Sequence, residues 1–173
     1  NMSEADVLMY EENVLGLDYA GNAAVEFQEV RLYVTKILLN DTAEEQNKSI
    51  QLIKEHIAEA EEYLQLYEDG IISDADRKQF NDLKPKWEEY KSLIDKEFEL
   101  VQLGESEQLE KLVLVDIASV GESVMESFNS LLEYNSNVAN TRLEQNKQIA
   151  STASTRMIFV IFIGVIAAIA LGL

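Results

Sequence analysis

The stretch SIQLIKEHIAEAEEYLQLYEDG, residues 49–70, decides the fold, because its apolar residues recur at alternating steps of three and four. This spacing places side chains along one face of an α-helix. The apolar residues on that face are Ile50, Ile53, Ile57, Ala60, Leu64 and Tyr67. Most of the remaining positions are charged or amide residues, so the stretch predicts a helix with one buried stripe.

The same periodicity extends through most of the chain, which holds only one proline. It is interrupted at LLNDTAEE (38–45), EDGIISDADR (68–77) and VQLGESEQ (101–108). We therefore expect four helices, over about 3–39, 42–69, 74–103 and from 105 onward. Short loops make neighbouring helices antiparallel, so the sequence predicts an all-α, antiparallel up-down-up-down four-helix bundle.

Each interruption carries signals for ending or starting a helix. Gly70 and Gly104 are expected to end the second and third helices. The candidate N-cap residues are Asn40 or Asp41 for the second helix, Ser73 or Asp74 for the third, and Ser106 for the fourth. Asp41 and Glu44 also have the spacing of a capping box.

The third and fourth helices continue the core pattern. Inward positions of the third are Phe80, Leu83, Trp87, Tyr90, Ile94, Phe98 and Val101, and those of the fourth are Ile117, Val124, Phe128, Leu131, Asn135, Val138 and Ile149. Pro85 lies inside the third helix, where we expect a kink or an unpaired carbonyl. Trp87 and Tyr90 fit either core packing or an aromatic box.

The chain has 173 residues and a formal net charge of −18. This charge disfavours binding to nucleic acid or to anionic lipid surfaces, since phosphates would be repelled. The absence of cysteine excludes disulfides and thiolate chemistry. Acidic clusters such as EAEEY (59–63) and KWEEYK (86–91) are expected on solvated faces. No spacing indicates a nucleophilic triad, a phosphate loop or a zinc site, so we expect no enzyme, cofactor or metal.

The final segment, ASTASTRMIFVIFIGVIAAIALGL (150–173), differs from the acidic chain before it. Residues 157–173 contain no charge, amide or proline. At about 1.5 Å per residue they cover roughly 25 Å, close to the ~30 Å of a bilayer core. They predict a truncated transmembrane helix that continues the fourth helix without a break. The alternative is a hydrophobic tail that docks in a groove. The antiparallel order also predicts an earlier span before Asn1.

A four-helix bundle between two spans resembles the ligand-binding domain of bacterial chemoreceptors, the methyl-accepting chemotaxis proteins. The segments that carry the resemblance are LMYEENVLGLDYAGNAAVEFQEVRLYVTKILLND (8–41), WEEYKSLIDKEFELVQLGESEQ (87–108) and SFNSLLEYNSNVANTRLEQNKQIA (127–150). The resemblance implies that residues 1–156 form a periplasmic or extracellular sensor domain at the bacterial inner membrane. It also implies a homodimer packed along the first and fourth helices, and a signal carried by a small displacement of the fourth.

The resemblance places a ligand near the membrane-distal ends of the first and fourth helices. The candidate ligand-binding residues there are Arg31, Tyr33, Thr35, Lys36, Leu109 and Leu112. Receptors for aspartate and serine hold the ligand carboxylate with several arginines, whereas this region offers only Arg31 and Lys36 as cations on the first helix. The facing stretch EQLEKLVLVD (107–116) is mostly apolar. An amino-acid site of that kind is not expected, and another small molecule, a partner protein or no direct ligand remain alternatives.

Two single residues have competing interpretations. Arg31 fits either a guanidinium fork for a carboxylate ligand or an ion pair with Asp116. His56, the only histidine, is expected to be an exposed helix residue, because a Glu-x-x-His di-iron motif would need an acid where Ile53 stands.

The sequence therefore predicts the sensor domain of a transmembrane chemoreceptor, with a small-molecule ligand of unknown identity. One alternative is the same module on a histidine kinase or diguanylate cyclase. Another is a tail-anchored structural or interaction bundle without a ligand.

Overall fold

The computed structural model describes residues 15–40 and 42–172, without the side chains of residues 150, 153, 154, 156 and 158–172. The described residues form helices and no strand: α2 (Leu15–Leu39), α3 (Ala43–Asp69), α4 (Asp74–Leu103), α5 (Ser106–Lys111), η2 (Leu112–Ile117) and α6 (Ala118–Gly172). The chain divides into two units, of which the first ends at Ser136 and the second begins at Asn137. The helix predicted over residues 3–14 lies outside the described residues.

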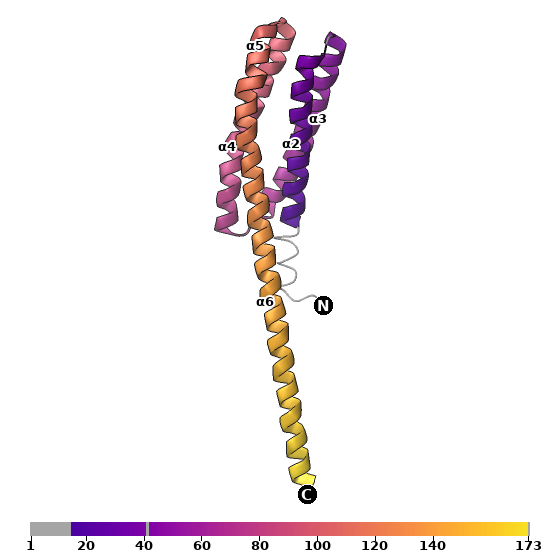
Figure 1. Ribbon diagram of the computed structural model, residues 1–173, viewed down its shortest axis with the longest axis vertical. Coiled ribbons are helices and arrows are strands. Elements are labelled where there is room, and N and C mark those ends of the chain that lie inside the picture. The colour runs from indigo at the N-terminus through magenta and orange to yellow at the C-terminus, as the bar shows by residue number, and fades with distance from the viewer. Residues whose placement is uncertain (1–14, 41, 173) are drawn as a thin grey trace. The chain divides into compact units, whose positions relative to one another are not determined.

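The first unit is an antiparallel four-helix bundle. Figure 1 shows α2, α3, α4 and the fourth helical segment, formed by α5, η2 and the start of α6, lying side by side and alternating in direction. This confirms the predicted all-α, up-down-up-down arrangement. The α2 and α3 helices pack against each other, and the small residues Ala20, Ala23 and Ala60 on these helices are fully buried.

Most predicted helix ends are confirmed, and two caps differ by one residue. Ser73 caps α4, and Gly104 ends it with a φ of 71°, a conformation that favours glycine. The cap of α3 is Thr42, whose hydroxyl accepts a hydrogen bond from the Glu45 backbone N–H. The predicted Asn40 or Asp41 cap is therefore wrong. Ser106 is the first residue of α5, not its cap.

The inward-facing positions predicted for the helices form the core. The buried hydrophobic residues on α3 and α4 are Ile50, Ile53, Ala60, Leu64, Tyr67, Phe80, Leu83, Trp87, Tyr90, Ile94, Phe98 and Leu100, with Ile57 and Val101 packed partly against them. Trp87 and Tyr90 are thus core residues. Pro85 lies inside α4, which nevertheless continues to Leu103. Ile149, which the pattern predicted on the apolar stripe, is 67% exposed. It lies in the second unit, whose described residues all belong to α6.

An aromatic cluster occupies the middle of the core. The Phe27 ring lies 5.0 Å from Tyr90, 5.9 Å from Trp87 and 5.7 Å from Phe128, measured between ring centroids. The first two contacts are edge-to-face, an arrangement that aromatic rings prefer. These rings join α2, α4 and α6 at one level of the bundle.

A buried polar network lies at the opposite end of the bundle from the α2–α3 turn. Asn135 of α6 donates to the Tyr67 hydroxyl at 2.6 Å and to the Leu131 carbonyl at 2.9 Å. The Tyr67 hydroxyl donates to the Asp76 carboxylate. Burial, followed by this bond to Asp76, raises the pKa of Tyr67. The network ties α3, α4 and α6 together. Asn135, a polar residue at a predicted inward position, is therefore buried in the core.

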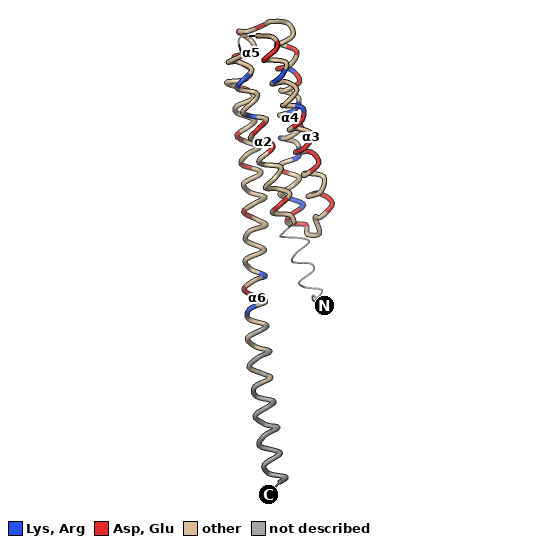
Figure 2. The backbone as a smooth tube through the Cα atoms, turned by 90° about the vertical axis from the view of Figure 1, so that its right-hand side faces the viewer, with Lys and Arg blue, Asp and Glu red and all other residues tan. Residues whose placement is uncertain are grey.

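Acidic residues are spread along the helices rather than gathered in one place. Figure 2 shows acidic positions along α3 and α4. The acids of the two clusters expected to be solvated are exposed: Glu59, Glu61, Glu62, Glu88 and Glu89. The charge of the chain therefore covers the bundle surface.

The fourth helical segment continues as α6 to Gly172. Most side chains of the predicted span, residues 157–173, lie outside the described part, as does Leu173 altogether. A search of the described residues finds no helix with enough length and apolar character to cross a membrane.

Candidate functional site

The fourth helical segment contains one π-helical turn. This turn, η2, spans Leu112–Ile117 between α5 and α6, and the Ala118 N–H donates to the Val113 carbonyl five residues back. A π-turn holds more residues than an α-turn, is rare, and occurs frequently at functional sites. Within the turn Leu112, Val113 and Ile117 are buried, whereas Leu114 and Val115 are exposed.

A groove of about 360 Å³ lies between α2 and this turn. Its lining comes from three helical segments: Gln28, Arg31, Leu32, Val34 and Thr35 of α2, Tyr90 of α4, and Val113, Leu114, Ile117 and Ala118 of the fourth segment. The groove combines one cation and two polar side chains with a larger number of apolar side chains. That combination suits a small molecule with one charged end and an apolar body.

Arg31 supplies the only cation of this groove. Its guanidinium contacts the Gln28 amide oxygen at 3.5 Å and lies 5.9 Å from the Phe27 ring centroid. No ion pair joins Arg31 to Asp116 or to another described acid, so the predicted pair with Asp116 is not found within that part of the chain. Because its charge is unpaired there, Arg31 can hold a carboxylate through its fork of N–H donors.

Gly121 of α6 lets the groove form. A Cβ atom at this position would lie 3.1 Å from Tyr90 Cε2 and 3.6 Å from Arg31 Nε. The lack of a side chain therefore allows the Tyr90 ring and the Arg31 side chain to approach α6. The role of Gly121 cannot be predicted from the sequence, because a glycine inside a helical pattern gives no sign of what packs against it.

Below the groove, the core holds polar groups without partners. The Tyr90 hydroxyl, Trp87 Nε1 and both carboxylate oxygens of Glu97 make no hydrogen bond within the described structure. Burial raises the pKa of Glu97 to about 8. Burial, and then the nearby Glu97, raises the pKa of Tyr90. The wall of the groove at Tyr90 thus adjoins a region in which an ionised carboxylate is unfavourable.

The six predicted site residues do not all meet. Arg31 and Thr35 line the groove, and the Thr35 hydroxyl donates to the Arg31 carbonyl at 3.1 Å. Tyr33 and Lys36 pair elsewhere, with the Lys36 ammonium 4.3 Å from the Tyr33 ring centroid. Leu109 and Leu112 are 5% and 3% exposed and belong to the core. The groove residues that were not predicted come from all parts of its lining: Gln28, Leu32 and Val34 of α2, Tyr90 of α4, Val113, Leu114 and Ile117 of η2, and Ala118 of α6.

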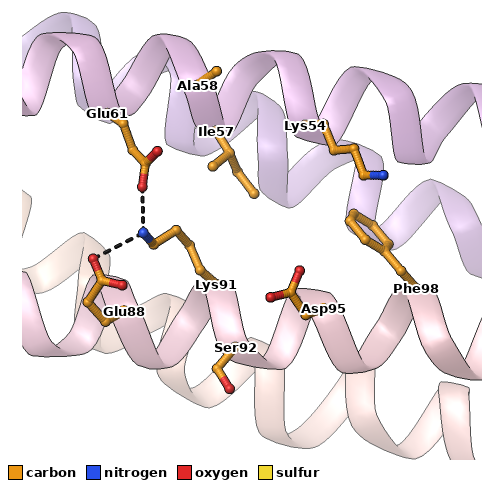
Figure 3. Close-up of a pocket in the computed structure, with 9 residues that line it drawn as sticks. All are labelled: Lys54, Ile57, Ala58, Glu61, Glu88, Lys91, Ser92, Asp95 and Phe98. Carbon is orange, nitrogen blue, oxygen red and sulfur yellow. Dashed lines mark hydrogen bonds and ion pairs between the residues drawn. The ribbon is translucent and has the colours of Figure 1, made fainter.

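A second groove of about 460 Å³ lies between α3 and α4. Figure 3 shows Lys91 between Glu61 and Glu88, with Nζ–O distances of 2.5 and 3.0 Å. Although burial acts in the opposite direction, hydrogen bonds to these two glutamates raise the pKa of Lys91. The Lys54 ammonium lies 5.3 Å from the Phe98 ring centroid. Because Lys91 is already neutralised, this groove is less suited to an anion than the one at Arg31.

The sequence of this chain is similar to those of known proteins. A family described as "Four helix bundle sensory module for signal transduction" matches residues 1–150. A protein of Acetivibrio thermocellus, whose name describes it as a sensory transducer, is 47% identical over 143 residues, which are 83% of this chain. The chain spans 26% of that protein's length. No solved structure matches.

Proposed function

Because this chain belongs to the four-helix-bundle sensory modules for signal transduction, we propose that it is the sensor domain of a bacterial transmembrane chemoreceptor. In this proposal residues 1–156 lie outside the inner membrane and residues 157–173 enter it. The domain binds a small carboxylate with an apolar body and catalyses no reaction itself. The name of its relative, a sensory transducer, supports this class of output.

The observation that carries the proposal is the Arg31 guanidinium, which pairs with no acid among the described residues and lies beside a π-turn. The carboxylate of a ligand binds Arg31, and the Thr35 and Gln28 side chains that also line the groove supply further polar contacts. The apolar body packs against Leu32 and the exposed Leu114. The volume of about 360 Å³ lies in the range of small-molecule sites.

The π-turn gives the ligand a way to act on the fourth helix. If η2 converts to regular α-helix, the register between α5 and α6 changes by about one residue, or roughly 100° of rotation. A ligand that contacts both α2 and η2 favours one of the two packings. A difference in binding free energy of about 1–3 kcal/mol between them shifts the population enough for a signal.

Exposed apolar residues support a homodimer along the first and fourth helices. Val25, Leu32 and Leu39 follow one another on α2 at steps of seven residues and are 59%, 46% and 75% exposed. Such a stripe is the pattern of a helix–helix contact. Leu114 and Val115 of η2 are also more than half exposed. A second copy that covers this stripe would lie against the groove at Leu32.

Binding of carboxylates tests the proposal. Thermal melts of the chain are measured against butyrate, isovalerate and benzoate, with the matching amides, amines and a set of purines as controls. We expect at least one carboxylate to raise the melting temperature and its amide to have no effect. The Arg31→Gln variant should lose the response, whereas Arg77→Gln, which removes the same charge from an arginine paired with Glu68, should keep it.

Two other outcomes point to the alternatives. If no compound of the panel binds, a tail-anchored structural or interaction bundle explains the chain better than a receptor does. The same module on a histidine kinase or a diguanylate cyclase would use the same groove, and the region encoded after Leu173 distinguishes these outputs.

A further inference from the structure

A second polar cluster lies on the face shared by α2 and α3, away from Arg31 and Thr35. It consists of Glu26 of α2 and of His56 and Glu59, which stand almost one turn apart on α3. One ligand atom from each residue lies within 4.8 Å of the others. The cluster is separate from the proposed carboxylate groove, whose lining includes none of these residues.

The geometry of the cluster is close to that of a metal site. His56 Nδ1 lies 2.7 Å from Glu26 Oε2. Around a tetrahedral zinc ion, ligand atoms at about 2.0–2.2 Å from the metal are roughly 3.3 Å from one another. The His56 and Glu26 atoms need to separate by only about half an ångström to accept an ion between them. Glu59 is exposed, so its flexible side chain can close the remaining distance.

The histidine is held in place from one side. The Tyr33 ring stacks on the imidazole with a centroid distance of 5.6 Å and an interplanar angle of 13°. This contact fixes the plane of the ring, as second-shell contacts do for metal-binding histidines. The His56 and Glu26 side chains are 22% and 17% exposed. They are therefore partly shielded while the site stays open to a metal-bound water.

Charge and donor type indicate which ion fits. Two carboxylates in a chain of net charge −18 attract a cation. One imidazole nitrogen with two carboxylate oxygens suits zinc and its first-row neighbours, whereas magnesium and calcium prefer oxygen ligands alone.

We propose that Glu26, His56 and Glu59 form a binding site for one divalent transition-metal ion, represented by Zn²⁺, which links α2 to α3. This site goes beyond the proposed carboxylate receptor and does not depend on it. The ion takes the place of the direct contact between His56 and Glu26 and adds Glu59 as a third ligand. Binding ties the two helices of the hairpin together and stabilises the bundle.

Titration of the metal-stripped, tag-free chain with ZnCl₂ tests the site, with MgCl₂ as the comparison ion. We expect one Zn²⁺ per chain by calorimetry, a rise in melting temperature, and no such rise with Mg²⁺. His56→Gln should abolish binding. Glu59→Gln should weaken it by more than about tenfold, and Glu89→Gln, which removes an exposed carboxylate on α4, should leave it unchanged.

Glu59 distinguishes a metal site from an ordinary ion pair between His56 and Glu26. If only that pair exists, the Glu59→Gln variant binds zinc no differently from the parent chain, and the proposal is wrong. Failure of the parent chain to bind stoichiometric Zn²⁺ at millimolar concentration also overturns it. Circular dichroism melts of each variant without metal separate loss of binding from loss of folding.

Discussion

Glu97 of α4 makes the stability of the bundle depend on pH. Its side chain is fully buried, and neither oxygen has a hydrogen-bond partner within the described residues. Burial raises its pKa from the usual 4.5 to about 8. The folded chain therefore holds a proton at neutral pH that the unfolded chain releases. Between these two pKa values the free energy of unfolding falls as the pH rises.

The size of this effect follows from the two pKa values. Each pH unit inside the window changes the free energy of unfolding by about 1.4 kcal/mol per proton. From pH 5 to pH 8 the change amounts to about 3 kcal/mol, because the slope weakens at both ends of the window. The Glu97→Gln variant has nearly the same shape but no titrating proton, so it should lack this contribution.

Urea unfolding followed by circular dichroism between pH 5 and pH 8 measures the effect. The advantage in stability of Glu97→Gln over the parent chain should grow by about 3 kcal/mol across this range. Glu99→Gln removes an exposed carboxylate two residues away and should follow the parent profile. Parallel profiles for the parent chain and Glu97→Gln would refute the assignment of a buried, neutral carboxyl group.

Four further substitutions test the fold by the same unfolding assay. Gly21→Ala should stabilise the chain by about 0.5–1 kcal/mol, because the added methyl group meets nothing within 4 Å. Gly104→Ala should destabilise the chain by about 1 kcal/mol, because Gly104 has a φ of 71°. Tyr67→Phe should cost about 1–3 kcal/mol, because the buried Asn135 amide loses its acceptor at 2.6 Å. Ser73→Ala should cost about 1 kcal/mol through the loss of the α4 cap.

The bundle could be predicted from the sequence because its signal is repeated along every helix. Ile53, Leu83 and Val124 each lie on a regular apolar stripe and are fully buried. The α3 cap was missed by one residue because Asn40, Asp41 and Thr42 are adjacent polar residues with similar capping propensity. Tertiary packing, which the sequence does not display, selects among them.

The π-turn could not be predicted by the same reasoning. The run LVLV (112–115) is apolar at every position, so it gives no helical phase from which an extra residue could be detected. The turn is identified only by its backbone, in which the Ala118 N–H donates to the Val113 carbonyl five residues back. The regular spacing of inward residues from Ile117 to Val124 gives no sign of the π-turn at residues 112–117.

Helical geometry explains why the predicted ligand-binding residues separate into two groups. Arg31 and Thr35 are four residues apart and share one face of α2, whereas Tyr33 and Lys36 are three apart and share another. The first pair lines the groove. In the second pair, the Tyr33 ring stacks on His56 and the Lys36 ammonium lies over the Tyr33 ring. The spacing alone could have divided the group. The contact between Tyr33 and His56 could not be predicted from the sequence, because His56 lies on another helix.

The most direct test of the central claim is the distance between α4 and α6 with and without a bound carboxylate. The chain has no cysteine, so spin labels can be attached at the exposed Lys78 and Glu133 after substitution by cysteine. Pulsed electron paramagnetic resonance in lipid nanodiscs then compares the free chain with the chain saturated by the most stabilising carboxylate. We expect the distance distribution to shift by more than about 2 Å, because a rotation of roughly 100° carries the surface side chains of α6 around the helix axis, and to stay fixed in Arg31→Gln. An unchanged distribution in the parent chain would contradict the coupling of the groove to the fourth helix.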